Sequence, residues 1–401
     1  MPEPSKVVVV SQHYPPDPGT TAAIMSKISE HLAAERPVLV LSGWAGSATH
    51  EPASSKRPVV VEIKNRMAAK GALIKRAAAE ASFTIRAFLA ALRTLRRGDV
   101  ALTVTAPFML PYAVAAAAKL KRARSALIMH DLYPDVLVMA GLLKPSSIPA
   151  RAMRAANALM FRALDAVVII GRDTEQLLLG HGGLTRDKIR FIPNWATLSP
   201  GVRPVRSDNR YRRGHAARFL VGLSGNLGFT HDPLIVFEAA RLLRDDPDIH
   251  FLLSGWGIGF QRLKEMQSEA GLPNVTLLDR VEEDHLEEFL AAANVWLIPY
   301  RKDVAGVSVP SRFYNLLAVG RPVILVSEPD AEAALTVSEH DIGWVTPPGD
   351  AAELARTVRL AFSSEDPDRA ERAAGIAGRF NFDAAMAGYS AMIGELQRNA
   401  G

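Results

Sequence analysis

The sequence predicts an α/β protein built from two Rossmann-like parallel-sheet domains that face each other across a cleft. Its 401 residues are enough for two domains of ordinary size. Two successive series of short apolar strands alternate with helical segments, which is typical of parallel sheets covered on both faces. Residues 199–218, rich in Pro, Arg, Asp and Asn, separate the two series and indicate a linker.

We therefore expect an N-terminal domain over residues 1–200 and a C-terminal domain over residues 201–380. Residues 381–401 should form a C-terminal helix that packs back toward the first domain, because Phe380–Leu396 is amphipathic. The expected strands are Lys6–Ser11, Pro37–Ser42, Val59–Ile63, Val100–Thr105, Ser125–Met129, Ala166–Gly171, Ile189–Pro193, Phe219–Leu223, Ile249–Leu253, Val275–Leu278, Val295–Ile298 and Val323–Val326.

The amino-acid composition excludes several kinds of chemical site. Apolar residues make up 48% and charged residues 22%, an ordinary globular mixture, and there is no cysteine. Disulfides, thiolate metal sites and cysteine nucleophiles are therefore excluded. The N-terminus does not resemble a signal peptide and no run of about 18 apolar residues occurs, so we expect a cytoplasmic protein.

The net charge of +5 is unevenly distributed. Residues 1–200 hold 26 Lys and Arg against 14 Asp and Glu, whereas residues 201–401 hold 21 against 28. The basic helical region Lys64–Arg97 is either a solvated face or a patch that meets anionic membrane lipid. Stacking aromatic residues of a nucleic-acid module are missing, so nucleic acid is not an expected partner. Further basic residues follow at Lys119, Lys121, Arg122 and Arg124.

Polar residues follow the expected strands of the N-terminal domain, at the edge where parallel sheets bind ligands. His130 comes directly after one strand, where its ring is suited to bond a sugar hydroxyl or a developing charge. Gly19 and Thr20 end the loop after the first strand. Gly19 either approaches a ligand or simply starts the next helix.

Glycine-bearing loops follow two strands of the C-terminal domain. Ser224–Asp232 contains Gly225, Asn226 and His231, and Ser254–Gly259 begins with Ser254 and Gly255. Such glycines let backbone amides approach a phosphate or a ring closely. Neither loop has the G-x-G-x-x-G spacing, so NAD is not expected.

The segment Asp303–Val323 predicts a phosphate site. A helix opened by Pro310 and closed by Gly320 would present its free N–H groups and positive dipole end beside Ser311 and Arg312. Asn315, one helical turn further along, would face the same phosphate site.

With these motifs the whole chain resembles the retaining glycosyltransferases of family 4, which have the GT-B fold. The resemblance is most specific in HYPPDPGTTA, HDLYPD, IPNW, SGNLG and VPSRFYNLLAVGRPV. It is closest to the bacterial enzymes that build capsule, O-antigen or exopolysaccharide. The resemblance implies transfer of a sugar from a nucleotide diphosphate-sugar to a saccharide acceptor, in this case a lipid-linked one, without a metal or other cofactor.

The resemblance also implies residue roles. Gly19 and Thr20 would approach the donor phosphates and acceptor, and His130 the transferred sugar. Arg312, assisted by Ser311, would hold the diphosphate as it leaves. The remaining donor-side positions are Gly225, Asn226, His231, Gly255, Arg280, Val281, Val307, Ser308 and Asn315.

The chain departs from the family at three places. Val307 and Asn315 stand where two glutamates are usual, so backbone amides around Val307 and Ser308 would have to contact the sugar. Asn226 and His231 replace the usual basic residues of the phosphate loop. These changes leave two alternatives open, a nucleotide-sugar 2-epimerase of the same fold and a degenerate, non-catalytic nucleotide-sugar-binding protein.

Overall fold

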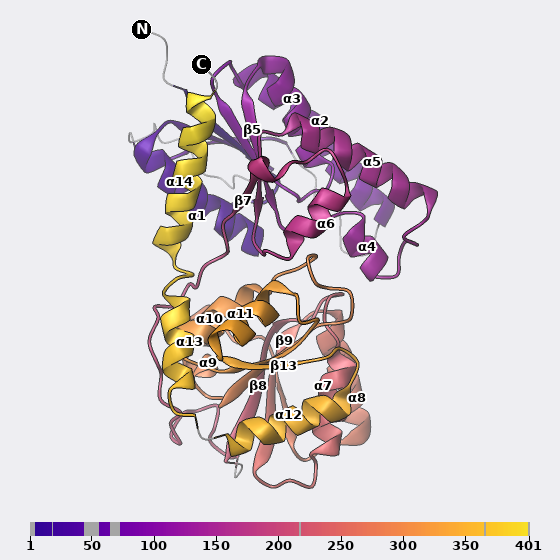
Figure 1. Ribbon diagram of the computed structural model, residues 1–401, viewed down its shortest axis with the longest axis vertical. Helices are drawn as coiled ribbons and strands as arrows, with labels where there is room; N and C mark the ends of the chain where they lie inside the picture. Colours follow the sequence, from indigo (N-terminus) through magenta and orange to yellow (C-terminus); the bar gives the residue numbers. More distant parts are fainter. Residues whose placement is uncertain are drawn as a thin grey trace.

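The computed structural model describes residues 5–17, 19–43, 56–64, 73–215, 218–364 and 366–399. They form two α/β domains, one above the other in Figure 1, each built on its own parallel sheet. The sheet of the N-terminal domain has seven strands in the order β3-β2-β1-β4-β5-β6-β7. Its strands are β1 Val7–Ser11, β2 Val38–Ser42, β3 Val59–Glu62, β4 Val100–Val104, β5 Arg124–Met129, β6 Ala166–Ile169 and β7 Ile189–Phe191.

The sheet of the C-terminal domain has six parallel strands in the order β10-β9-β8-β11-β12-β13. Strand order reverses direction between β1 and β4 in the first sheet and between β8 and β11 in the second. In open α/β sheets ligands bind at these switch points, beyond the carboxyl ends of the strands. The strands are β8 Phe219–Asn226, β9 Ile249–Trp256, β10 Val275–Leu278, β11 Val295–Pro299, β12 Val323–Val326 and β13 Gly343–Thr346.

Helices cover both faces of both sheets, so central strands such as β1 and β4 are buried along their whole length. In the N-terminal domain they are α1 Thr20–Glu35, α2 Leu73–Thr94, α3 Leu110–Lys121, α4 Asp135–Met139, α5 Ile148–Ala163, α6 Thr174–Gly180 and the 3₁₀ turn Arg186–Lys188. In the rest of the chain they are α7 Pro233–Leu242, α8 Ile258–Ala270, the 3₁₀ turn Glu283–His285, α9 Leu286–Leu290, α10 Ser311–Ala318, α11 Glu332–His340, α12 Ala351–Ser363, α13 Arg369–Ala377 and α14 Phe382–Arg398.

The last helix, α14, leaves the C-terminal domain and lies beside α1 on the first domain (Figure 1). Met386, Tyr389 and Ile393 are buried there in one core with β1 and β4. Arg190 of β7 holds the Glu395 carboxylate through two hydrogen bonds of 2.8 and 2.9 Å. The chain therefore crosses between the domains twice, once in the segment before β8 and once before α14.

The structure differs from the sequence predictions at a few boundaries. The edge strand β13 was missed because its sequence, GWVT, is short and only half-buried. Strands β8 and β9 run three residues further than expected, because the pairs Gly225–Gly255 and Asn226–Trp256 continue the ladder. Pro310 is the N-cap residue of α10 rather than a member of its first turn, with an extended ψ of 111°.

Within the expected basic region Lys64–Arg97, the structure describes Lys64 and the helix α2, which begins at Leu73. Arg66 and Lys70 lie outside the described residues. In the linker, the described residues between β7 and β8 contain no regular helix or strand.

Candidate functional site

The glycine loops of the C-terminal domain lie side by side at its switch point. A Cβ atom on Gly255 would lie 2.3 Å from the carbonyl oxygen of Gly225, so this close approach excludes any larger residue. Gly257 has φ +93°, and a Cβ there would meet Asn226 Oδ1 at 2.3 Å. These glycines therefore serve the contact between two loops, and the exposed Asn226 side chain is held at their junction.

Arg312 lies at the start of α10, in the helix that follows β11 on the other side of the switch point. Its side chain is partly buried, yet the guanidinium has no hydrogen-bond or ion-pair partner among the described residues. Burial lowers its pKa, and nearby Arg280 lowers it further, while Glu283 acts in the opposite direction. A half-buried cation with no direct ion pair among the described residues, beside the first N–H groups of a helix, is suited to bind an anion.

Arg280, beyond the end of β10, stacks its guanidinium 4.5 Å from the ring centre of Trp256. Trp256 ends β9 and is 37% exposed. Val281 packs its side chain against the core of the domain. Trp256 was not singled out from the sequence; an aromatic residue between two glycines at a strand end was the available signal.

His231 lies between the loop after β8 and the end of β11. Its backbone pairs with Tyr300, its ring lies 5.1 Å from the Tyr300 ring, and Nδ1 is 3.0 Å from Thr230 Oγ1. Burial, with the positive charge of Arg301, lowers the pKa of His231 to about 4. A neutral imidazole does not replace the charge of a lysine, so His231 offers hydrogen bonds only.

The structure brings His130 of the N-terminal domain together with the loop before α10 of the other. A narrow hollow between the domains is lined by His130, Val307, Ser308 and further residues of both domains. Burial lowers the pKa of His130 to about 4, and its buried Nε2 has no hydrogen-bond partner among the described residues. A neutral histidine with an unused ring nitrogen is thus positioned at the domain interface.

Gly19 and Thr20 lie at the start of α1. Gly19 has φ −71°, a conformation open to any residue, and its N–H donates to Asp17 Oδ1 at 2.8 Å. Asp17 Oδ2 in turn lies 2.6 Å from His13 Nδ1. Thr20 is exposed as the first residue of the helix, and Ser311 is likewise exposed as the first residue of α10.

Asn315 is buried in α10, and its side chain bonds the segment that joins the domains. Its Oδ1 accepts hydrogen bonds from the backbone N–H groups of Thr197 and Leu198 at 2.7 and 3.3 Å, and its Nδ2 donates to Thr197 Oγ1 at 2.9 Å. The sequence predicted that the Asn315 carboxamide faces the same side of the site as Arg312. It does not, because its hydrogen bonds go to Thr197 and Leu198. It ties α10 to the linker.

A polar clamp across the domain interface was missed from the sequence. Arg172 of the N-terminal domain donates to the Glu332 carboxylate of α11 through Nε at 2.9 Å and Nη2 at 3.1 Å, and to the Glu339 carboxylate through Nη1 at 3.0 Å. Its neighbour Asp173 accepts hydrogen bonds from the backbone N–H groups of Gly306 and Glu332 at 2.8 and 3.0 Å. The available signal was a charged pair directly after the strand Ala166–Gly171, the same arrangement as in HDLYPD.

Across the part of the chain that the structure describes, no group of three or more His, Asp or Glu residues is arranged to hold a metal ion. In the same residues no helix has the length and apolar character needed to cross a bilayer.

Two family models match the chain. One, described as a glycosyl transferase 4-like domain, matches residues 19–195, and the other, described as glycosyl transferases group 1, matches residues 218–363. Together they contain the strand ends, glycine loops and α10 described above.

Curated relatives carry similar descriptions. The chain is 29% identical over 265 residues to the probable glycosyltransferase WbjE of Pseudomonas aeruginosa, a match that covers 66% of each protein. It is 28% identical over 218 residues to the putative colanic acid biosynthesis glycosyl transferase WcaI of Escherichia coli strain K12, covering 53% of each. The matches thus span about two thirds and about half of these relatives' own lengths.

The solved structure of Anabaena Alr3699/HepE in complex with UDP and glucose is similar over 98% of this chain and 100% of that one, with a TM-score of 0.69 and 17% identity. At this identity the likeness shows the fold alone. It confirms the prediction of a GT-B fold with two parallel-sheet domains.

Proposed function

We infer that this chain, which carries a glycosyl transferase 4-like domain followed by a group 1 glycosyl transferase domain, moves a sugar from a nucleotide diphosphate-sugar to a saccharide acceptor. We further propose that the anomeric configuration is retained and that the product belongs to a bacterial surface polysaccharide. The names of WbjE and WcaI and the complex of the Anabaena protein with UDP and glucose support this proposal.

The observation that carries the proposal is the guanidinium of Arg312 at the switch point of the C-terminal domain, which has no ion-pair partner in the part of the chain that the structure describes. In the reaction, the bond between the sugar C1 and the diphosphate oxygen breaks, and a bond from C1 to the acceptor oxygen forms. The departing diphosphate gains negative charge, which Arg312 and the first N–H groups of α10 are placed to stabilise. The acceptor hydroxyl proton passes to the departing phosphate or to solvent.

The N-terminal domain supplies the other wall of the site. His130 reaches the interface hollow with Nε2 unused, and the loop at Val307 and Ser308 lines the same hollow. We propose that the transferred sugar binds where the two domains meet beside this hollow, with His130 and backbone groups of the loop in place of the missing glutamate. Since His130 is neutral, it would hydrogen-bond a hydroxyl rather than carry charge.

The direct test is incubation with panels of UDP- and GDP-sugars, with and without membrane extract. Nucleotide release that depends on the extract supports glycosyl transfer. Isomerisation of the donor without acceptor would replace the proposal by the 2-epimerase reaction. Nucleotide binding without turnover in every mixture would indicate the degenerate, non-catalytic alternative.

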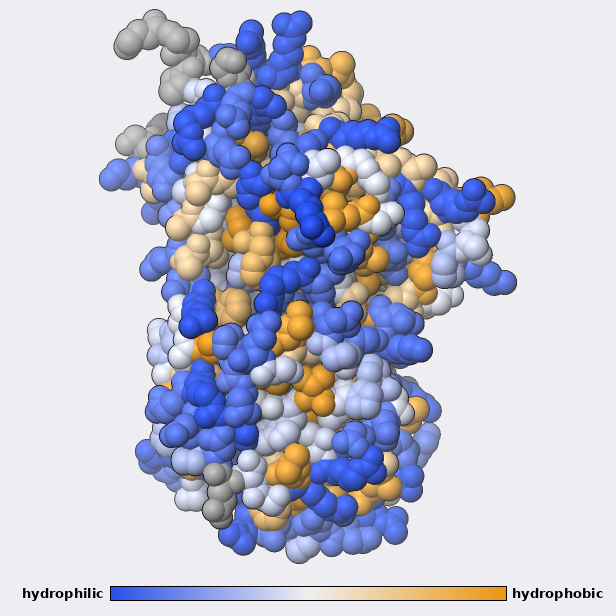
Figure 2. Space-filling view, in the orientation of Figure 1, coloured by the Kyte–Doolittle hydropathy of each residue, from blue (hydrophilic) through white to orange (hydrophobic). Residues whose placement is uncertain are grey.

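We also propose that the acceptor is lipid-linked and that the outer helices of the N-terminal domain contact an anionic membrane. The sequences of α3 and α5 contain no Asp or Glu, and α2 contains Glu80 alone. Hydrophobic and hydrophilic residues alternate over this part of the domain in Figure 2. The exposed apolar side chains here are Ile85, Leu89, Met109, Leu120, Leu142, Ile148 and Leu159.

Apolar side chains beside arginine and lysine, with almost no carboxylates, match a surface of anionic headgroups over acyl chains. Replacing Arg93, Arg96 and Arg97 with Gln should weaken binding to vesicles of phosphatidylglycerol and phosphatidylcholine. A matched variant, in which three exposed arginines of the C-terminal domain become Gln, should bind like the parent. Equal vesicle binding by all three proteins would reject the membrane surface. The control substitutions are at Arg241, Arg356 and Arg359.

A further inference from the structure

Two loops, one from each domain, line the narrow hollow at the domain interface. The loop from the N-terminal domain joins β5 to α4 and carries His130. The loop from the C-terminal domain joins β11 to α10 and carries Gly306, Val307 and Ser308. The position of each loop decides whether the groups proposed to contact the sugar lie at one place.

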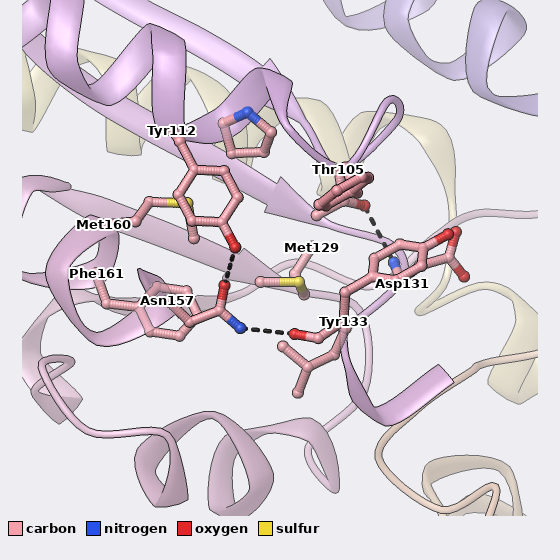
Figure 3. Close-up of a pocket in the computed structure, with 11 residues that line it drawn as sticks. Thr105, Tyr112, Met129, Asp131, Tyr133, Asn157, Met160 and Phe161 are labelled. Carbon is pink, nitrogen blue, oxygen red and sulfur yellow. Dashed lines mark hydrogen bonds between the residues drawn. The ribbon is translucent and has the colours of Figure 1, made fainter. Parts of the chain in front are cut away.

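The β5–α4 loop is held by side chains of its own domain. Thr105 Oγ1 accepts hydrogen bonds from the backbone N–H groups of His130 at 3.3 Å and Asp131 at 3.1 Å. Asn157 of α5 donates from Nδ2 to the Tyr133 carbonyl at 2.6 Å. Figure 3 shows the bonds to Asp131 and Tyr133 as dashed lines. None of these bonds involves the C-terminal domain.

The β11–α10 loop is held from both domains. Within its own domain, Val304 is buried in the core, and its carbonyl accepts the N–H of Val307 at 2.9 Å to form a turn. Gly306 in this turn has φ +75°, and its N–H donates across the domain boundary to Asp173 Oδ2 at 2.8 Å. The residue next to Val307 is thus bonded to the N-terminal domain.

The same carboxylate oxygen of Asp173 also bonds the start of α11. This helix begins at Glu332, and its N-cap residue Ala331 makes no side-chain hydrogen bond. The N–H of Glu332 donates to Asp173 Oδ2 at 3.0 Å, so a carboxylate of the other domain lies at the positive end of the helix dipole. Asp173 therefore joins the loop to a rigid element of the C-terminal domain.

The turn that carries Asp173 packs closely against the β11–α10 loop. A Cβ atom on Gly171 would lie 2.8 Å from Val309 Cγ2, and a Cβ atom on Gly306 would lie 3.0 Å from the Asp173 carbonyl oxygen. Asp173 Oδ1 is buried without a hydrogen-bond partner among the described residues, and desolvation raises the pKa of this carboxyl group. Desolvating a carboxylate costs free energy, which the two N–H bonds to Oδ2 offset.

We propose that Asp173 is a positioning residue, which sets the β11–α10 loop at the sugar site by binding the N–H of Gly306. In that position Val307 and Ser308 line the same hollow as His130. The acceptor for Gly306 comes from the N-terminal domain, so this side of the site is completed only when the two domains are in contact. The role rests on the proposed transferase function, because it concerns the place where the transferred sugar binds.

Hydrogen exchange of the full chain, followed by mass spectrometry, tests the bond. In Asp173→Ala, peptides that cover residues 303–309 should exchange about 10-fold faster than in the parent, because the Gly306 N–H loses its acceptor. Asp99→Ala is the matched control. Asp99 is a buried carboxylate directly before β4 that accepts the N–H groups of Lys6 and Arg96 at 3.0 and 2.9 Å. Its loss should leave the exchange of residues 303–309 unchanged.

Turnover with the donor found by the panels tests the role in the reaction. Asp173→Ala should lower kcat about 10- to 100-fold, because a small displacement of the loop misplaces the sugar. The affinity for UDP or GDP alone should not change, because Arg312 and α10 are proposed to hold the diphosphate. Asp173→Asn keeps an acceptor oxygen and should recover most of the turnover. Folded Asp99→Ala should turn over like the parent.

Gly306→Ala disturbs the same contact from the other side, since a side chain at this φ is strained and would crowd Asp173. It should give the same two changes, and it replaces Asp173→Ala if that variant does not fold. Unchanged exchange of residues 303–309, or the turnover of the parent in a folded Asp173→Ala variant, would overturn the inference. If the parent turns over no donor, the transferase proposal fails, while exchange still decides whether Asp173 holds the loop.

Discussion

The clamp between Arg172 and Glu332 gives a prediction whose size follows from the structure. Replacing Arg172 with Ala leaves the Glu332 carboxylate, whose side chain is 5% exposed, without its guanidinium partner. The backbone N–H of residue 172 at 2.6 Å and Thr336 Oγ1 at 3.2 Å remain as donors. The carboxylate is therefore only partly orphaned.

Losing one partner of a fully buried ion pair costs about 3–5 kcal/mol, whereas an exposed pair contributes about 0.2–1 kcal/mol. Arg172 is 41% exposed and two donors to Glu332 remain, so we expect a loss of about 1–3 kcal/mol. Because the clamp joins the two domains, the variant should also scatter X-rays at small angles with a larger radius of gyration than the parent.

Urea unfolding of Arg172→Ala, Glu332→Gln and the double variant measures the coupling free energy of the pair directly. Arg262→Ala, which removes an exposed i,i+3 pair with Glu265, is the matched control and should change stability by less than about 0.5 kcal/mol. A coupling energy near zero, together with an unchanged radius of gyration, would refute the assignment of Arg172 as an interdomain clamp.

Two further predictions concern buried polar groups. Asn315→Ala should lower the free energy of unfolding by about 1–3 kcal/mol, because the N–H groups of Thr197 and Leu198 lose their acceptor; a variant as stable as the parent in urea would show that the tie to the linker contributes nothing. Burial lowers the pKa of His130 from 6.5 to about 4. Between these two pH values the unfolded chain therefore binds a proton that the folded chain does not. The free energy of unfolding should fall as the pH falls through this window, by ~2 kcal/mol at pH 5. His130→Gln should therefore lose less stability than the parent between pH 7 and pH 5, and an identical loss in both proteins would exclude a buried neutral His130.

Much of the fold could be predicted from the sequence because its strands are fully buried. Continuous apolar runs such as Val7–Val10 and Val323–Val326 have one plausible structure when helices alternate with them. The edge strand β13 lacked such a run, and the extension of β8 through Asn226 depends on pairing with β9, which no local pattern shows.

The candidate site, like the fold, could be predicted only in part from the sequence. Strand ends and helix starts placed His130 and Arg312 at the correct edges of their sheets, since that placement follows from topology. Contacts between distant segments could not be read from the sequence. The hydrogen bonds of Asn315 to Thr197 cross 118 positions, and those of Arg172 to Glu332 cross 160.

The central claim is that Arg312 holds the diphosphate as it leaves, and turnover of Arg312→Ala tests it most directly. With the donor and acceptor identified by the panels, the account predicts that the activation barrier rises by about 2–4 kcal/mol, or roughly 30- to 1,000-fold in rate. Arg359→Ala, which removes an exposed arginine from α12, should turn over like the parent. A folded Arg312→Ala variant with the turnover of the parent would contradict the account.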